Sequence, residues 1–178
     1  FKEHNYPTFL PMAGSYNIEN LLASVLVVHY ATGTPMETIC DAVTSLTPAP
    51  GRMTPVSRGQ PFSVTVDFAH TPGAFSKLLP AVKKQTEGKL IVLFGSAGER
   101  DRNKRVMQGA IAEAYADIIV LADEDPRNEQ PEAILEHIAS ACSGHQRGTS
   151  LFLIPDRKKA IRKAFSLAGP GDAVLLLG

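Results

Sequence analysis

The stretch Lys89-Leu-Ile-Val-Leu-Phe-Gly-Ser-Ala-Gly98 contains an unbroken apolar run that ends in two closely spaced glycines. A continuous apolar run of this length is typical of a β-strand that is covered on both faces. The same pattern recurs in Asp117–Ala122, Ser150–Ile154 and Ala173–Leu177. Phe62–Asp67 alternates in the manner of a strand. The sequence therefore predicts five strands, most of them buried.

Helical patterns separate these predicted strands, and each is about a dozen residues long. They cover Gly73–Gln85, Lys104–Tyr115, Pro131–Ser143 and Arg157–Ala168. Strands that alternate with helices of this length predict right-handed βαβ units. We therefore expect an α/β fold in which helices cover both faces of a mostly parallel sheet.

The first part of the chain has a different pattern. Residues 14–31 carry apolar side chains at the spacing of an amphipathic helix, and a second helix is expected from Pro35 to about Ser45. Pro48-Ala-Pro-Gly51 then interrupts any regular structure, because two prolines and a glycine in four residues cannot continue a helix. This segment is the predicted domain boundary.

Composition gives no reason to expect several classes of partner. The 18 Lys and Arg residues balance the 18 Asp and Glu residues, so no net charge favours binding to nucleic acid or to an anionic membrane. No apolar run reaches the roughly 20 residues that a membrane span needs. Cys40 and Cys142 lie far apart without a CxxC pattern, which favours two reduced thiols in a cytosolic protein over a disulfide or a metal site.

Polar and charged residues follow three of the predicted strands. Asp67-Phe-Ala-His-Thr-Pro72 follows the first, Gly95–Arg105 the second and Asp123-Glu-Asp-Pro-Arg127 the third. Because ligands of parallel sheets bind at the carboxyl ends of the strands, these segments are the candidate site. The alternative for any single Asp or His is a helix cap or a turn residue.

The glycines after the second strand do not form a known nucleotide-binding loop. Neither G-x-x-x-x-G-K-S/T nor G-x-G-x-x-G occurs in the chain. Four cations follow these glycines: Arg100, Arg102, Lys104 and Arg105. They suit a carboxylate or a phosphate, and the alternative is a solvated helix start.

The same segments, in this order, resemble the Mur ligase family and, within it, the tripeptide synthetases. The matching stretches are Gly14–Asn20, Pro50-Gly-Arg52, Val66–Pro72, Gly95–Arg105, Asp125-Pro-Arg127 and Asp156-Arg157. The strings Asp67–Pro72 and Gly98–Arg105 carry most of the resemblance.

The resemblance implies a division of the chain. Residues 1–48 would be the C-terminal helices of the central ATPase domain, and residues 49–178 the Rossmann-like C-terminal domain that binds an amino acid, truncated at its end. The P-loop would lie before Phe1, and a Gly-Lys-Gly-His-Glu segment would begin at Gly178. ATP and Mg²⁺ would be bound mainly outside this chain, and the fragment alone would be inactive.

The reaction implied by the resemblance is ATP-dependent amide formation through an acyl phosphate in the bacterial cytoplasm. A free amino acid would be added to a UDP-N-acetylmuramoyl-dipeptide during peptidoglycan synthesis, with no catalytic residue in this fragment. The resemblance assigns nucleotide binding to Asn17, Asn20, Arg52, Asp67 and His70. Asn17 has an alternative role as a helix cap, and His70 as a packing residue of the loop.

The amino-acid site implied by the resemblance consists of Arg100, Asp125 and Arg127. The family signature reads Asp-Asn-Pro-Arg in the enzymes that add diaminopimelate, whereas this chain has Asp125 in place of the Asn. An Asp offers only acceptors, which favours an ammonium group as its partner, while Arg127 favours a carboxylate. The substrate is therefore expected to be a diamino acid, either meso-diaminopimelate or L-lysine.

Two alternatives from the residues remain. Cyanophycin and folylpolyglutamate synthetases share a similar loop to Asp67–Pro72, although Thr71 and the Glu99–Arg105 string favour the tripeptide synthetases. A non-catalytic Rossmann-like binding module is the other alternative. The helices expected before Pro48 disfavour it, because their apolar faces need a partner.

Overall fold

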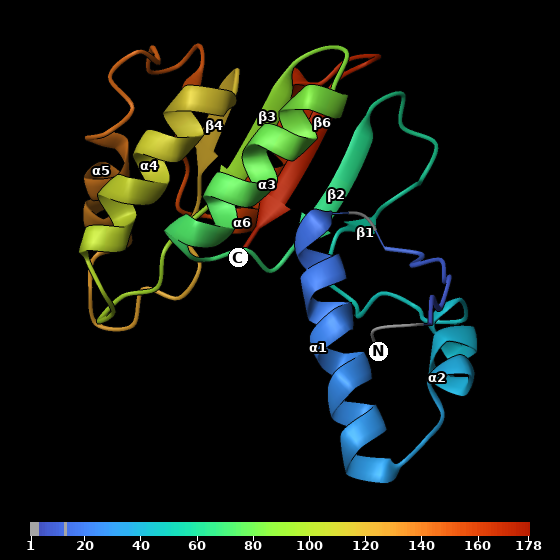
Figure 1. Ribbon diagram of the computed structural model, residues 1–178. Helices are drawn as coiled ribbons and strands as arrows, with labels where there is room; N and C mark the ends of the chain where they lie inside the picture. Colours follow the sequence, from blue (N-terminus) through green and yellow to red (C-terminus); the bar gives the residue numbers. More distant parts are fainter. Residues whose placement is uncertain (1–3, 13) are drawn as a thin grey trace. The chain divides into compact units, whose positions relative to one another are not determined.

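The computed structural model describes residues 4–12 and 14–178, and the chain divides into two compact units, Phe1–Pro50 and Gly51–Gly178. Each unit is described by itself. The first contains helices α1 (Ser15–Thr32) and α2 (Met36–Val43). Figure 1 shows the two units along the chain.

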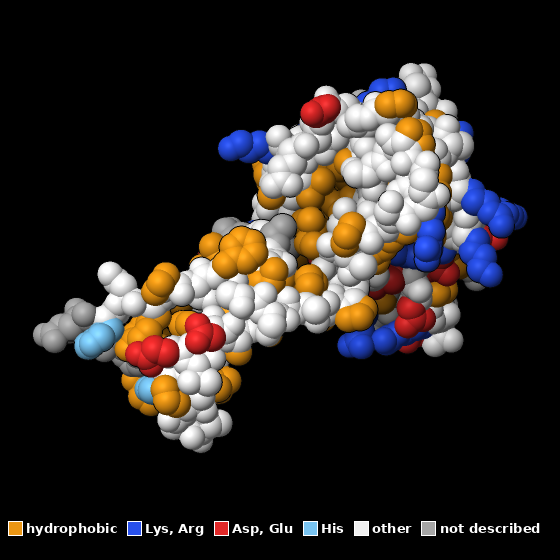
Figure 2. Space-filling model, turned by 90° about the vertical axis from the view of Figure 1, so that its right-hand side faces the viewer, with side chains coloured by type: hydrophobic (Ala, Val, Ile, Leu, Met, Phe, Trp, Pro, Cys, Tyr) orange, Lys and Arg blue, Asp and Glu red, His pale blue; other side chains and the backbone are white. Residues whose placement is uncertain are grey.

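Helix α1 forms as predicted, but most of its apolar stripe lies on the surface. Val25 packs with Ile39 and Val43 of α2 in a small core. Ile18 and Leu22 are 55% and 59% exposed, and hydrophobic side chains are visible on the surface of this unit in Figure 2. Helical spacing therefore predicted the helix correctly but not which side chains this unit buries.

The second unit is built on one six-stranded sheet with the order β1-β2-β6-β3-β4-β5. Its strands are β1 (Thr54–Pro55), β2 (Ser63–Asp67), β3 (Leu90–Phe94), β4 (Ile118–Leu121), β5 (Leu151–Leu153) and β6 (Ala173–Leu177). All neighbours are parallel except β1, which pairs antiparallel with β2. The last strand of the chain lies between β2 and β3, so all five predicted strands enter one sheet.

Four helices cover the sheet: α3 (Pro72–Gln85), α4 (Asn103–Tyr115), α5 (Pro131–Ala139) and α6 (Arg157–Leu167). Side chains of α3, α4 and α5 share a core with one face of the strands, including Phe75, which packs edge-to-face on Phe94. Ala160 and Ala164 of α6 pack on the other face. Figure 1 shows α3 and α4 on one side of the sheet and α6 on the other. The predicted α/β fold with helices on both faces is confirmed.

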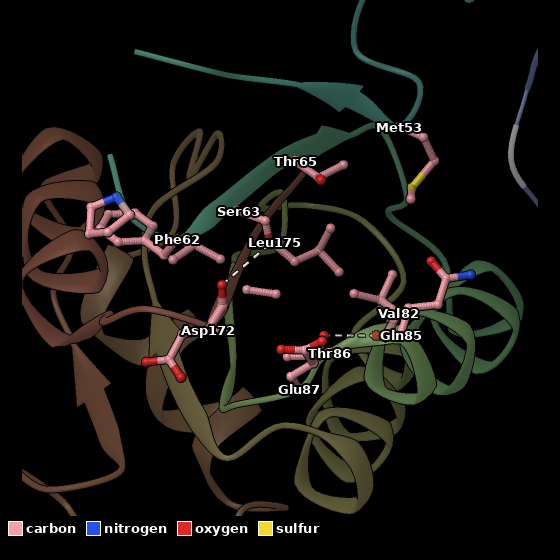
Figure 3. A pocket seen from close by; sticks show the side chains of 14 residues that line it. Met53, Phe62, Ser63, Thr65, Val82, Gln85, Thr86, Glu87, Asp172 and Leu175 are labelled. Carbon is pink, nitrogen blue, oxygen red and sulfur yellow. Dashed lines mark hydrogen bonds between the residues drawn. The ribbon is translucent and has the colours of Figure 1, made fainter. Parts of the chain in front are cut away.

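The alternation in β2 follows from this arrangement. Val64 and Val66 pack in the core beneath α6. Ser63 and Thr65 line an open pocket of about 430 Å³ on the side of α3. Figure 3 shows this pocket between β2, β6 and the end of α3. Polar residues are tolerated there because the described helices of this unit leave that part of the sheet open.

Two polar residues that follow strands are helix caps. The Thr71 side chain accepts a hydrogen bond from the backbone N–H of Ala74 at the start of α3. The Asp156 side chain accepts one from Lys159 at the start of α6. Asn17 is not a cap, because α1 begins at Ser15 with Gly14 as its N-cap, and the capping alternative for Asn17 is therefore wrong.

Candidate functional site

The candidate site lies along the carboxyl edge of the sheet, where β2, β3 and β4 end and their following segments begin. Backbone hydrogen bonds extend the strands into this edge. Gly178 donates to the carbonyl of Asp67 at 3.3 Å, and Ala122 donates to Phe94 at 2.9 Å. The sequence-predicted residues Arg52, Asp67, His70, Arg100, Asp125 and Arg127 all belong to this unit.

Asp67 holds two loops at the end of β2. Its Oδ2 accepts a hydrogen bond from the backbone N–H of Met53 at 2.9 Å, and its Oδ1 accepts one from Ala69 at 2.8 Å. The residue is only 6% exposed. The two backbone N–H groups therefore replace the hydrogen bonds to water that the carboxylate loses on burial. Met53 has a positive φ of 47°, which indicates that this anchor holds the loop in an unusual conformation. A contact of Asp67 with a nucleotide stays a prediction.

Arg52 and His70 both contact the Phe68 ring. The Arg52 guanidinium carbon is 5.0 Å from the centre of the Phe68 ring, within the range of a cation–π contact. The His70 ring meets the same phenyl edge-on at 4.8 Å, and its Nδ1 lies 2.9 Å from the carbonyl oxygen of Phe68. Two predicted nucleotide residues are therefore brought together, and the residue that joins them was missed.

The loops after β3 and β4 pack against each other through their backbones. Gly98 donates a hydrogen bond to the carbonyl of Asp125 at 2.7 Å. A Cβ at Gly98 would lie only 1.9 Å from the carbonyl oxygen of Pro126, so only glycine fits here without movement. Asn128 donates to Glu99 Oε1 at 2.6 Å from the other side. The two loops thus form one structure.

A buried ion pair fastens the same two loops. Arg105 of α4 is 2% exposed and binds Glu129 with both ends of its guanidinium, each at 2.9 Å. It also donates to the carbonyl of Ala97 at 3.3 Å, while Glu129 accepts from the backbone N–H of Glu99 at 2.6 Å. The hydrogen bonds from Arg105 lower the pKa of Glu129 to about 2. A paired, hydrogen-bonded arrangement of this kind is what a buried charge requires.

The four cations of the predicted cluster are therefore not equivalent. Arg105 forms a buried ion pair with Glu129. Arg102 lies on the surface, and its guanidinium is 3.3 Å from the same carboxylate. Arg100 is exposed and lies on the loop that Gly98 joins to Asp125. The alternative of a uniformly solvated helix start is wrong for Arg105.

Asp125 and Arg127 lie together on the partner loop. The Arg127 Nε is 3.5 Å from Asp125 Oδ2, and the two side chains are 34% and 61% exposed. Arg127 has a positive φ of 51°, which is uncommon for a residue other than glycine. An ion pair through Nε leaves the two terminal nitrogens of the guanidinium as a fork for a carboxylate.

Arg157 is a further residue at this edge to which the sequence assigned no role. Its guanidinium donates to the carbonyl of Leu177 at 2.8 Å and to that of Asp123 at 3.3 Å. Burial lowers the pKa of Arg157 and raises that of Asp123. Arg157 thereby ties the ends of β6 and β4, and its place just after Asp156 in the matching segments was the available signal.

Asn17 and Asn20 belong to the other unit, on α1. They are three residues apart and so share one side of the helix. Asn20 is exposed, and its backbone carbonyl accepts a hydrogen bond from Ser24 at 2.9 Å. Their predicted role toward a nucleotide stays a prediction.

The pocket in Figure 3 is a separate feature from the carboxyl edge. Most of its wall comes from the amino ends of β2 and β6 and from the end of α3, including Asp172 and Glu87. Asp172 is engaged by the backbone N–H groups of Lys89 and Gly169. We therefore place the candidate site at the opposite edge.

Two further findings bear on ligands and membranes. In residues 4–12 and 14–178, no group of three or more His, Cys, Asp or Glu side chains is arranged to hold a metal ion. Within the same residues no helix combines the length and apolarity of a membrane span.

Comparison with known proteins identifies the family. A model described as Mur ligase, glutamate ligase domain, matches residues 51–178. The UDP-N-acetylmuramyl-tripeptide synthetase of Treponema denticola is 51% identical over 176 residues, which cover 97% of this chain and 33% of that protein. The chain thus spans about a third of the length of the curated relative.

Solved structures agree with this result. A structure of UDP-N-acetylmuramoyl-L-alanyl-D-glutamate–2,6-diaminopimelate ligase is 33% identical, with a TM-score of 0.65 over 96% of this chain and 34% of the other. The folylpolyglutamate synthase of Mycobacterium tuberculosis, complexed with ADP and AMPPCP, has a TM-score of 0.78 over 97% of this chain and 40% of the other. It is 20% identical and shows the shared fold alone. The chain belongs to the Mur ligase family.

Proposed function

We propose that this chain is the amino-acid-binding part of an ATP-dependent ligase of peptidoglycan synthesis. The complete enzyme would join a free diamino acid to a UDP-N-acetylmuramoyl-dipeptide through an acyl phosphate. The observation that carries this proposal is the pair of locked loops at the carboxyl edge, which present Arg100, Asp125 and Arg127. Its relatives named as tripeptide synthetases support the same reaction.

Each of these three residues has a chemical role in the proposal. The terminal nitrogens of Arg127 bind a carboxylate of the incoming amino acid, and Arg100 supplies a second cation beside it. Asp125 accepts hydrogen bonds from the second ammonium group, because a carboxylate offers only acceptors. This combination favours a diamino acid, with meso-diaminopimelate as the leading candidate and L-lysine as the second.

The part of these residues in the reaction is positioning. The amine of the amino acid has to lie near the acyl phosphate and point toward it, and fixed charges at the carboxylate and the second ammonium restrict its orientation. The lock between Arg105 and Glu129 keeps the two loops in register while the ligand binds. No residue of this chain is proposed as a general base or nucleophile.

The nucleotide would contact this chain through Arg52, Asp67 and His70, together with Asn17 and Asn20 of the first unit. Arg52 and His70 carry N–H groups suited to phosphate and ribose oxygens. ATP supplies the phosphoryl group that activates the carboxylate. We assign the Mg²⁺ ligands and the P-loop to the rest of the enzyme, as the resemblance to the Mur ligases implies.

The exposed apolar face of α1 supports the proposed division of the chain. Ile18 and Leu22 lie on it and are more than half exposed, and a face of this kind usually packs against another element. We assign residues 1–48 to the closing helices of the central ATPase domain, whose remaining elements would cover this face. On this assignment the 178-residue chain has no ligase or ATPase activity by itself.

The test is a panel of amino acids assayed with the complete enzyme, its UDP-dipeptide substrate and ATP. The panel contains meso-diaminopimelate, L-lysine, L-ornithine and L-glutamate, and the readout is phosphate release with product mass. Phosphate release with a diamino acid supports the proposal. Release with L-glutamate alone, or with a folate acceptor in place of the UDP-dipeptide, would overturn it in favour of a folylpolyglutamate-type ligase.

The Asp125→Asn variant is the matched control for the role of Asp125, because it keeps the shape and removes the charge. We expect a larger loss in affinity for a diamino monocarboxylic acid than for diaminopimelate, whose second ammonium lies beside a carboxylate. Equal KM values of the parent enzyme and the Asp125→Asn variant for every diamino acid would remove Asp125 from the site.

A further inference from the structure

Phe68 is an exposed aromatic residue inside the candidate site. It is 50% exposed, and it belongs to none of the hydrophobic cores formed by the described residues. A phenyl ring that is exposed to water, lies outside any core and has polar neighbours suggests a role other than core packing. Its neighbours here are Arg52 and His70.

The Phe68 ring is held in place by the anchors around it. Asp67 fixes the backbone on both sides of the contact by binding Met53 and Ala69. His70 meets the ring edge-on at 63° and donates from Nδ1 to the carbonyl oxygen of Phe68, because a carbonyl oxygen can only accept. The ring therefore offers one face to Arg52 from a defined position.

The contact with Phe68 restrains Arg52 without using its hydrogen-bond donors. The guanidinium lies 5.0 Å from the ring centre, and its side chain makes no hydrogen bond or ion pair with any residue that the structure describes. A cation–π contact depends on the charge and the ring face, so all five N–H donors stay available to an anion. A carboxylate partner would have occupied two of them.

We propose that Phe68 is a positioning residue that holds the Arg52 guanidinium ready for the phosphates of the nucleotide. This inference rests on the proposed role of Arg52 in nucleotide binding. Restricting a long, flexible side chain before the ligand arrives lowers the entropy lost on binding. Phe68 acts through Arg52 and does not itself touch the reacting atoms.

The test uses the complete enzyme with Phe68→Leu, Phe68→Tyr and Phe68→Trp. Leucine keeps the apolar bulk but lacks a π face, whereas tyrosine and tryptophan keep it. We expect Phe68→Leu to raise the KM for ATP about 2- to 5-fold with little change in kcat or in the KM for the amino acid. The Tyr and Trp variants should stay close to the parent enzyme.

Phe152→Leu is the control for the loss of a phenyl under a cation elsewhere. Lys163 lies 4.6 Å from the Phe152 ring on β5, away from the loops at the end of β2. This variant should leave the KM for ATP unchanged. Melting temperatures of all variants separate a loss of folding from a loss of positioning, and the half-exposed Phe68 should affect them little.

Combination with Arg52→Ala distinguishes the two proposals. Arg52→Ala should raise the KM for ATP at least about 30-fold, and adding Phe68→Leu should then have no further effect. If Arg52→Ala raises the KM and Phe68→Leu does not, the positioning role is wrong and the nucleotide role of Arg52 stands. If Arg52→Ala leaves the KM unchanged, the nucleotide role itself is wrong. Equal effects of all three Phe68 variants, or additive effects in the double variant, would also overturn the positioning role.

Discussion

Replacing Gly98 by alanine should separate the two loops that carry the proposed amino-acid site. The new Cβ would lie 1.9 Å from the carbonyl oxygen and 2.6 Å from the carbonyl carbon of Pro126. Both are backbone atoms, which cannot rotate away as a side chain can. The φ of Gly98 is not among the positive values, so the effect is steric and not a matter of backbone conformation.

The magnitude follows from the contact distances. An ordinary Cβ contact begins near 3.4 Å, so the loops must move apart by about 1.5 Å, a distance at which misplacement of binding groups costs about 100-fold in rate. The hydrogen bond from Gly98 to Asp125, now 2.7 Å, cannot survive this shift. Loss of that bond and overpacking together should lower the free energy of unfolding by about 2–4 kcal/mol.

Two assays check this prediction. Urea unfolding of the 178-residue chain measures the stability change, and steady-state kinetics of the complete enzyme measure kcat/KM for the amino acid. We expect the loss in kcat/KM to be confined to the amino acid, with the KM for ATP near its parent value. Gly169→Ala is the control, because its Cβ would meet only Asp172 Oδ2 at 3.9 Å. A Gly98→Ala variant as stable and as active as this control would refute the coupling of the two loops.

Three further predictions concern the same unit. The folded pKa of Glu129 is about 2, below the ordinary value of 4.5. Its contribution to stability is therefore complete above pH 4.5 and is lost as the pH falls toward 2. In an acid titration monitored by circular dichroism, the Glu129→Gln variant should lose less stability over this pH range than the parent chain. Burial raises the pKa of the Cys142 thiol to about 11. In a Cys40→Ser variant the folded chain should therefore resist alkylation by iodoacetamide at pH 8 and react only in denaturant. Rapid alkylation of the folded chain would contradict this. Arg127→Ala in the complete enzyme should raise the KM for the amino acid at least about 10-fold while that for ATP changes little, and an unchanged amino-acid KM would remove Arg127 from the site.

The middle of the sheet was predictable because β3, β4 and β6 bury both faces. Apolar runs such as Leu90–Phe94 have one stable environment, and the structure places them in the centre. The strand Thr54–Pro55 was missed because two residues carry no periodic signal. Helix α5 ends at Ala139, earlier than expected, because the residues that follow form turns, and the Ser140 hydroxyl donates to the carbonyl of His137.

The site was less predictable because its geometry depends on residues far apart in the sequence. The sequence pattern grouped Arg105 with its cationic neighbours. The charge pattern alone does not reveal that Arg105 forms an ion pair with Glu129 of the neighbouring loop. The same limit applies to Phe68, whose importance lies in its contact with Arg52 in another loop. The order of strands and loops in the sequence predicted which segments lie at the carboxyl edge. Only the structure shows which side chains contact each other within those segments.

Burial divides the charged residues of this edge into two functional classes. Asp67 and Arg105 are at most 6% exposed, and protein groups bind both carboxylate oxygens of Asp67 and both terminal nitrogens of Arg105. A buried charge that exchanged its partners for a ligand would lose stability each time the ligand left, because an unpaired buried charge is costly. Exposed Arg52 and Arg100 carry no such cost, since water replaces the ligand. The ligand contacts of this edge should therefore come mainly from its exposed charged residues, while the buried groups set where those residues stand. Asp67 would accept from the nucleotide only in addition to the hydrogen bonds that it already accepts from Met53 and Ala69.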